Sequence, residues 1–157
     1  DYYYNSENKD FQKSVFENQI KLALKHDIPI MVHDREAHGD TLELLKKYKP
    51  KGIVHCFSGS SEMAKEVIKL GMHLGIGGVV TFKNAKNITE VVKNVPLSSM
   101  VLETDAPYLA PLPFRGKRCD SSHIKYTAEK MAELKSMEVL QVLKITKENA
   151  INLFGIK

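Results

Sequence analysis

The fold is decided by three stretches of sequence: IPIMVH (residues 28–33), GIVHCF (residues 52–57) and MVLETD (residues 100–105). Each stretch is an apolar run that carries, at or near its end, a side chain suited to binding metal: His33, His55 or Asp105. Apolar runs without polar alternation are typical of parallel strands that helices cover. These runs therefore predict strands of a parallel sheet.

The segments between the predicted strands have helical apolar spacing, so strands and helices alternate along the chain. HLGIGGVV (residues 73–80) predicts one further strand between the second and the last. Helices are expected at residues 9–26, 42–48, 62–70, 84–95, 122–135, 137–144 and 147–154. The expected helix caps are Asp40, Ser60 or Ser61, and Thr146, and the expected stops are Gly71 and Gly155.

This alternation predicts an α/β fold with a parallel sheet in a single domain, residues 1–157. Four strand–helix units equal half of an eight-stranded (β/α) barrel, whose usual length is about 250 residues. An open doubly wound sheet would also fit four strands, and periodicity alone does not choose between the two. The chain begins at Asp1, without Met, on an aromatic run, as a segment of a longer protein would.

The composition is ordinary for a globular protein, with 43% hydrophobic residues, 27% charged residues and a net charge of +4. The chain has no apolar run of the roughly 18–20 residues that cross a membrane, and no signal-peptide pattern at its start. We therefore expect a cytoplasmic protein with no membrane partner. Cys56 and Cys119 are expected to be reduced. Neither lies in a CxxC pair, so a thiolate zinc site is not expected.

The strand-end residues His33, His55 and Asp105 suggest a metal site. In a (β/α) barrel the carboxyl ends of the strands meet at one rim, where such residues would come together. Two imidazoles and a carboxylate suit a borderline divalent cation, which activates bound water. Asp105 is then the expected proton acceptor, and Glu103 shares its side of the strand. Taken singly, each histidine could instead be hydrogen-bonded in a loop or core, and Asp105 could be a loop cap.

The segment RGKR (residues 115–118) follows the last predicted strand and is expected at the same rim. The forked guanidinium groups of Arg115 and Arg118 suit phosphate oxygens, and Lys117 adds positive charge. These three residues are therefore candidates for binding a phosphate-bearing substrate. The alternative is a solvated basic turn.

Five segments together resemble the TatD family of metal-dependent deoxyribonucleases, which belongs to the amidohydrolase-like barrels. They are DYYY (1–4), VHDREAHGDTL (32–42), HCFSG (55–59), LETDAPYLAP (102–111) and RGKR (115–118), and the likeness extends to NLFG (152–155). The resemblance implies a hydrolase that cleaves DNA phosphodiester bonds exonucleolytically with magnesium, manganese or zinc. It implies that His33 and His55 are metal ligands and that Asp105 is both a ligand and a proton acceptor. The basic loop would lie near the substrate phosphates.

Two features of the family pattern are missing from this chain. The family has an H-x-H pair on its first strand and a metal-bridging Glu after its fourth, and neither is present. After RGKR, the family's Asn-Glu-Pro is replaced by Cys119-Asp120-Ser121. The resemblance thus implies a partial (β/α)₈ barrel, strands five to eight with their helices, with the N-terminal half missing. The alternatives are an inactive fragment or pseudo-enzyme that associates with a partner to complete the barrel, or a metal-dependent amide or ester hydrolase.

Overall fold

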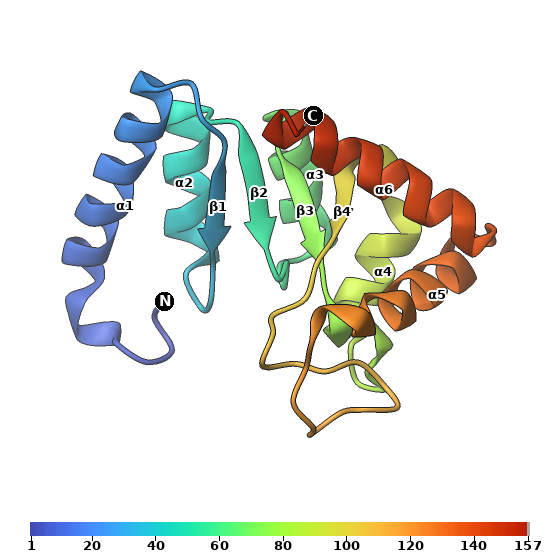
Figure 1. The fold of residues 1–157 in the computed structure, drawn as a ribbon. Helices are drawn as coiled ribbons and strands as arrows, with labels where there is room; N and C mark the ends of the chain where they lie inside the picture. Colours follow the sequence, from blue (N-terminus) through green and yellow to red (C-terminus); the bar gives the residue numbers. More distant parts are fainter. Residues whose placement is uncertain (157) are drawn as a thin grey trace.

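Four short parallel strands lie side by side in the order in which they occur in the chain, in a computed structural model that describes residues 1–156 (Figure 1). They are β1 (Ile30–His33), β2 (Gly52–His55), β3 (His73–Ile76) and β4 (Met100–Leu102). The predicted α/β fold with a parallel sheet is confirmed. β1 and β4 are the two edge strands of this sheet.

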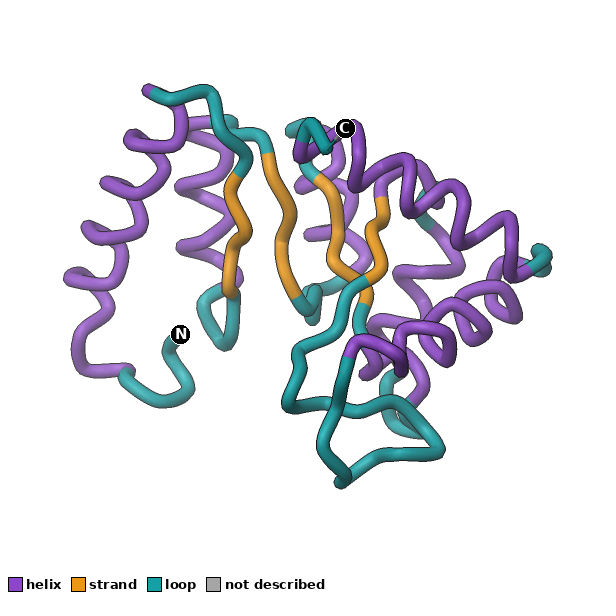
Figure 2. The backbone as a smooth tube through the Cα atoms, viewed as in Figure 1, coloured by secondary structure: helices purple, strands orange, loops and turns teal. Residues whose placement is uncertain are grey.

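Six α-helices follow or connect the strands, as the colouring by secondary structure in Figure 2 shows. They are α1 (Lys9–Lys25), α2 (His38–Tyr48), α3 (Ser61–Lys69), α4 (Lys86–Asn94), α5 (Ile124–Lys135) and α6 (Val139–Phe154). Short 3₁₀ turns lie at Ser6–Asn8, Gly78–Thr81, Leu97–Ser99 and Ser121–His123. All the helices of residues 1–156 are too short or too polar to cross a lipid bilayer.

The core lies between one face of the sheet and the helices. Val32, Val54, Leu74, Ile76 and Met100 point to this face and are buried in a single apolar cluster. Helix side chains complete the cluster: Leu45 of α2, Val67 of α3, Val91 of α4, Met131 of α5 and Val142 of α6. Removing this apolar surface from water is the main stabilising contribution to the fold.

The opposite face of the sheet carries the residues of interest for function. In a strand, side chains alternate between the two faces. Met31 and His33 of β1 therefore share a face with Ile53 and His55 of β2, to which they are paired in register. Ile53 is buried but Met31 is 62% exposed, so this face is open along β1.

Helix α1 is attached mainly to α2. The carboxylate of Glu17 accepts hydrogen bonds from the Tyr48 hydroxyl and the Lys47 ammonium, both on α2. Ile20 and Ala23 are the buried residues of α1.

Several predicted element boundaries were wrong. The third strand ends at Ile76 rather than continuing to residue 80, and Gly78 begins a 3₁₀ turn. A β-carbon at Gly78 would lie 2.4 Å from the Leu109 carbonyl oxygen, so glycine is needed where the later loop crosses. β4 ends at Leu102, which leaves Asp105 in the following loop.

The predicted caps had mixed outcomes. The Ser60 side chain accepts a hydrogen bond from the Met63 N–H, which confirms it as the cap of α3. Asp40 lies inside the first turn of α2, which begins at His38. Thr146 is not a cap, because α6 is one continuous helix. Its hydroxyl donates to the Val142 carbonyl within that helix, a local bond that the sequence pattern does not distinguish from a cap.

Candidate metal centre

The carboxyl ends of β1 and β2 place two histidines side by side. His33 and His55 are direct partners in the register of this parallel pair, so the predicted equivalence of the two strand ends is correct. Neighbouring strands lie about 4.8 Å apart, which is close enough for two side chains on one face to reach a common ion. This arrangement follows directly from two apolar strands of similar length.

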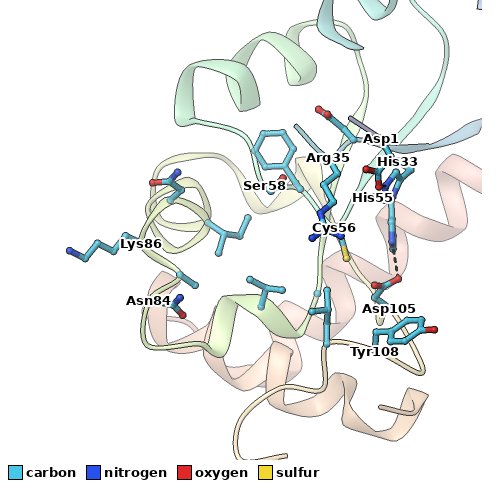
Figure 3. A pocket seen from close by; sticks show the side chains of 18 of the residues that line it. Asp1, His33, Arg35, His55, Cys56, Ser58, Asn84, Lys86, Asp105 and Tyr108 are labelled. Atoms are coloured by element: carbon cyan, nitrogen blue, oxygen red, sulfur yellow. Dashed lines mark hydrogen bonds and ion pairs between the residues drawn. The ribbon is translucent and has the colours of Figure 1, made fainter. Parts of the chain in front are cut away.

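Asp105 reaches the same point from the loop after β4. Its Oδ1 atom lies 3.3 Å from Nε2 of His55, a contact drawn as a dashed line in Figure 3. The two residues are 50 positions apart in the sequence. The structure therefore brings together His55 and Asp105 as the sequence predicted, with His33 on the adjacent strand.

Glu103 orients His55 and the following backbone through hydrogen bonds. Its Oε2 atom lies 2.8 Å from Nδ1 of His55, and its other oxygen accepts a hydrogen bond from the Cys56 backbone N–H. This fixes the Nδ1 atom of His55 as a donor and leaves Nε2 facing Asp105, the usual arrangement by which a carboxylate orients a metal-binding imidazole. A β-carbon at Gly75 would lie 2.6 Å from Glu103 Oε2, so β3 makes room for this carboxylate with a glycine.

Two residues of the site were missed by sequence reasoning. Cys56 lies with His55 and Asp105 in a cluster whose potential ligand atoms are all within 4.8 Å of one another. Asp1 contacts His33, with Oδ2 at 2.8 Å from Nε2. Nothing in the local sequence signals the Asp1 contact, because it joins positions 32 residues apart. Cys56 directly follows His55 in the sequence, and the CxxC criterion does not consider a single cysteine in that position.

The electrostatics of the two histidines differ. Hydrogen bonds to the Cys56 thiol and the Glu103 carboxylate raise the pKa of His55 to about 11. Burial lowers the pKa of His33. The contacts of His55 thus favour its protonated form, whereas the surroundings of His33 favour the neutral form. A cation that binds His55 must displace its proton, as is usual for metal ligands.

The centre opens into a cavity of about 950 Å³. Asp1, Tyr4, Arg35, Ser58, Asn84, Lys86 and Tyr108 line it together with the histidines and Asp105 (Figure 3). On one side the Arg35 guanidinium stacks on the Tyr3 ring at 3.8 Å. The cavity is large enough to hold a small substrate beside the histidines.

The basic segment lies away from the cavity wall. Arg115, Lys117 and Arg118 are exposed, and none of them is among the residues that line the cavity. The Arg115 guanidinium lies 4.3 Å from the centre of the Phe82 ring, and the Lys117 ammonium lies 6.0 Å from that of Phe114. The structure thus does not bring these three residues together with the histidines, and their role in binding substrate stays a prediction.

The residues present fit a divalent cation. The cluster offers nitrogen, sulfur and oxygen donors, with Glu103 and Asp105 supplying negative charge. Asp34, which also lines the cavity, is 7% exposed; its Oδ2 atom lies 2.8 Å from His38 Nδ1, and its Oδ1 atom has no hydrogen-bond partner. An unpaired buried carboxylate oxygen is unfavourable unless positive charge lies nearby.

Comparison with known proteins supports the same chemistry. The chain is 48% identical over 159 aligned residues to the uncharacterized metal-dependent hydrolase YabD of Bacillus subtilis, covering 99% of this chain and 62% of YabD. It is 38% identical to the uncharacterized metal-dependent hydrolase YcfH of Escherichia coli K12, covering 99% of this chain and 60% of YcfH. The chain therefore spans about three fifths of the length of these relatives.

A solved structure gives the same result for the fold. The crystal structure of YjjV, a TatD homolog from Escherichia coli K12, superposes with a TM-score of 0.87 at 28% sequence identity. The superposition covers 96% of this chain and 60% of YjjV. The family model described as TatD related DNase matches residues 1–155. The sequence, the fold and the donor cluster thus agree that this chain belongs to the TatD family of metal-dependent hydrolases.

Proposed function

We propose that this chain forms part of a divalent-metal centre that hydrolyses phosphodiester bonds in DNA. The observation that carries the proposal is the meeting of His55 and Asp105 at 3.3 Å beside His33, at the mouth of a cavity. The DNase description of the matching family supports DNA as the substrate class. Exonucleolytic cleavage is the mode implied by the resemblance.

The proposed ligands are His33, His55 and Asp105. A divalent cation bound here would lower the pKa of water and polarise the scissile phosphate. Asp105 is the proposed proton acceptor, because its carboxylate is half-buried at the cavity and has one oxygen free of His55. Glu103 orients His55 through Nδ1 and so keeps Nε2 directed at the cavity.

Arg115, Lys117 and Arg118 are proposed to bind the DNA backbone beyond the cavity. They are exposed on the loop that leads away from Asp105, on the same side of the molecule as the strand ends (Figure 1). Contacts of this kind add affinity that weakens with salt and carries no sequence information. Their effect should therefore appear in substrate binding rather than in the chemical step.

We also propose that the sheet corresponds to strands five to eight of a (β/α)₈ barrel. The four-stranded sheet and the 60% coverage of YjjV support this assignment. On α1, the residues Phe11, Val15 and Leu22 are spaced on one side of the helix and are 42–70% exposed, which supports a further segment packing there. The proposed association with a further segment would supply the remaining strands of the barrel to this side.

The expected cytoplasmic location of the protein stays a prediction.

The open side also supports the second candidate, a segment that is inactive until that association occurs. Nuclease assays on the 157-residue chain and on a longer form of the protein, each with magnesium, manganese or zinc, distinguish the two. If the longer form cleaves DNA and the 157-residue chain does not, the chain is a segment that is inactive by itself.

Asp105→Asn should abolish cleavage in any active form, with Asp10→Asn on the exposed start of α1 as the matched control. Unchanged turnover in Asp105→Asn would contradict the assignment of Asp105. Absence of DNA cleavage in every form, with cleavage of a carboxylic ester or amide, would contradict DNA as the substrate.

A further inference from the structure

We infer that Cys56 is a direct metal ligand of this centre and that its sulfur gives the site a preference for zinc-like cations over magnesium. The inference rests on the proposed metal centre and adds to it a donor that no histidine–carboxylate assignment includes. The juxtaposition that supports it is the cluster of His55, Cys56 and Asp105, whose ligand atoms lie within 4.8 Å of one another.

The backbone at Cys56 explains how adjacent residues reach one site. Consecutive side chains of an extended strand point to opposite faces, so His55 and Cys56 could not both face the cavity if β2 continued. β2 ends at His55, and Cys56 has φ +45°, in the left-handed region. This turn brings its sulfur to the side of Asp105 (Figure 3). Both residues line the cavity.

The conformation of Cys56 is unfavourable for a residue other than glycine. A left-handed residue with a β-carbon costs about 1–2 kcal/mol. Two hydrogen bonds hold it: the Cys56 N–H donates to Glu103, and the Phe57 N–H donates to the Gly75 carbonyl at 3.0 Å. Glycine would adopt this turn without strain, so the presence of cysteine here indicates a function for its side chain. Strained residues of this kind cluster at functional sites.

Asp34 also lines the cavity and is 7% exposed. Its Oδ2 atom lies 2.8 Å from His38 Nδ1, and its Oδ1 atom has no hydrogen-bond partner. Asp34 lies outside the ligand cluster of His55, Cys56 and Asp105, so it adds negative charge to the cavity wall rather than a ligand.

The donor type determines which cation is preferred. Thiolate sulfur is a soft ligand that selects zinc and similar ions, whereas magnesium takes oxygen ligands almost exclusively. Imidazole nitrogen, thiolate sulfur and carboxylate oxygen are all donors that zinc takes in proteins, so the set matches zinc rather than magnesium. On binding, the Cys56 thiol proton passes to solvent, and no bond to carbon changes.

Cobalt(II) is the probe that reports a sulfur ligand directly, because it occupies zinc sites and its thiolate complexes absorb in the near ultraviolet. We would titrate the 157-residue chain with cobalt(II) and follow this charge-transfer band, then displace the cobalt with zinc. The expected result is a band that saturates at one equivalent and disappears on adding zinc. Magnesium at the same concentration should not displace the cobalt.

Two variants and one control complete the experiment. Cys56→Ser and Cys56→Gly should both lose the band and bind zinc at least about 10-fold to 100-fold more weakly, since even indirect partners of a ligand have effects of that size. Cys56→Gly relieves the strained turn, so its loss of affinity cannot be attributed to unfolding. Cys119→Ser, which replaces the other, buried cysteine, is the matched control and should keep the band.

The outcomes separate this inference from the proposed function. Cobalt binding without the band, and equal zinc affinity in Cys56→Gly and the parent chain, would overturn the role of Cys56 while leaving the histidine–carboxylate centre in place. If neither cobalt nor zinc binds the parent chain, both the inference and the proposed metal centre fail for this chain.

Discussion

The centre of the sheet and its β1 side differ sharply in how completely they are packed. Leu74 and Ile76 of β3 are fully buried, and Glu103, His55 and Cys56 form a connected hydrogen-bonded group on the opposite face of the sheet. On the β1 side, Met31 is 62% exposed and Phe11 of α1 is 70% exposed. The centre of the sheet is fully packed, whereas the β1 side has exposed apolar side chains.

Stability and function depend on different parts of the sheet. The packed region supplies the free energy that holds β2, β3 and the loop after β4 in register, and with it the His55–Asp105 contact. The β1 side contributes His33 to the same centre from a strand that is supported on one side only. We therefore expect mutations in the first region to affect folding and mutations in the second to affect metal binding or association.

The largest expected effect comes from the packed region. Leu74→Ala removes a fully buried side chain and should lower the free energy of unfolding by about 2–5 kcal/mol. Met31→Ala, on the open face of β1, should change it by less than about 0.5 kcal/mol because the side chain is mostly exposed. Urea unfolding followed by circular dichroism measures both. Equal losses would show that the β1 side is packed in solution.

A smaller effect is expected from a substitution that displaces Glu103, the carboxylate that orients His55. In Gly75→Ala the new β-carbon would lie 2.6 Å from Glu103 Oε2, which must move away from His55 and Cys56. Overpacking of this kind costs about 1–3 kcal/mol, and zinc affinity should fall with it.

Gly39→Ala is the control for this change, because a β-carbon there meets nothing within 4 Å. Gly39 is the second residue of α2, so alanine there should stabilise the chain by less than the roughly 0.5–1 kcal/mol of a mid-helix position. Zinc affinity that is equal in both variants would contradict the supporting role of Glu103.

Much of the fold could be predicted from the sequence, because it depends on patterns that are local. Apolar runs without alternation gave all four strands, and the placement of His33 and His55 at two strand ends predicted their pairing. Ser60, whose side chain accepts the capping hydrogen bond, marked the start of α3. The parallel order of the sheet then brings the strand ends to one rim.

The remainder could not be predicted because it depends on contacts between distant segments. The left-handed turn at Cys56 is held by Glu103, 47 residues away, and the end of β3 reflects the crossing of the loop at Leu109. The basic loop was expected beside the histidines from its place in the chain. Its path past Phe82 is set by tertiary packing that no local pattern encodes.

The smallest expected effect concerns the attachment of α1. Hydrogen bonds from Tyr48 and then Lys21 lower the pKa of Glu17 from 4.5 to about 2. A carboxyl with a lowered pKa stabilises the fold above its unfolded pKa, and this contribution disappears as the pH falls from about 4.5 to about 2.

Glu17→Gln should therefore be less stable than the parent chain at pH 7, and the difference should shrink as the pH falls to 3. Urea midpoints at pH 7, 4 and 3 measure it, with the exposed Glu90→Gln on α4 as the control. A difference that stays constant with pH would show that Glu17 acts through packing rather than charge.

We propose that the strand ends of β1 and β2 and the loop after β4 assemble one divalent-metal centre. The most direct measurement is anomalous X-ray scattering at the zinc edge from crystals of this chain grown with zinc. The account predicts one strong peak within bonding distance of His55 Nε2 and Asp105, with Cys56 Sγ in contact. No peak at these residues, with zinc bound only elsewhere on the surface, would contradict it.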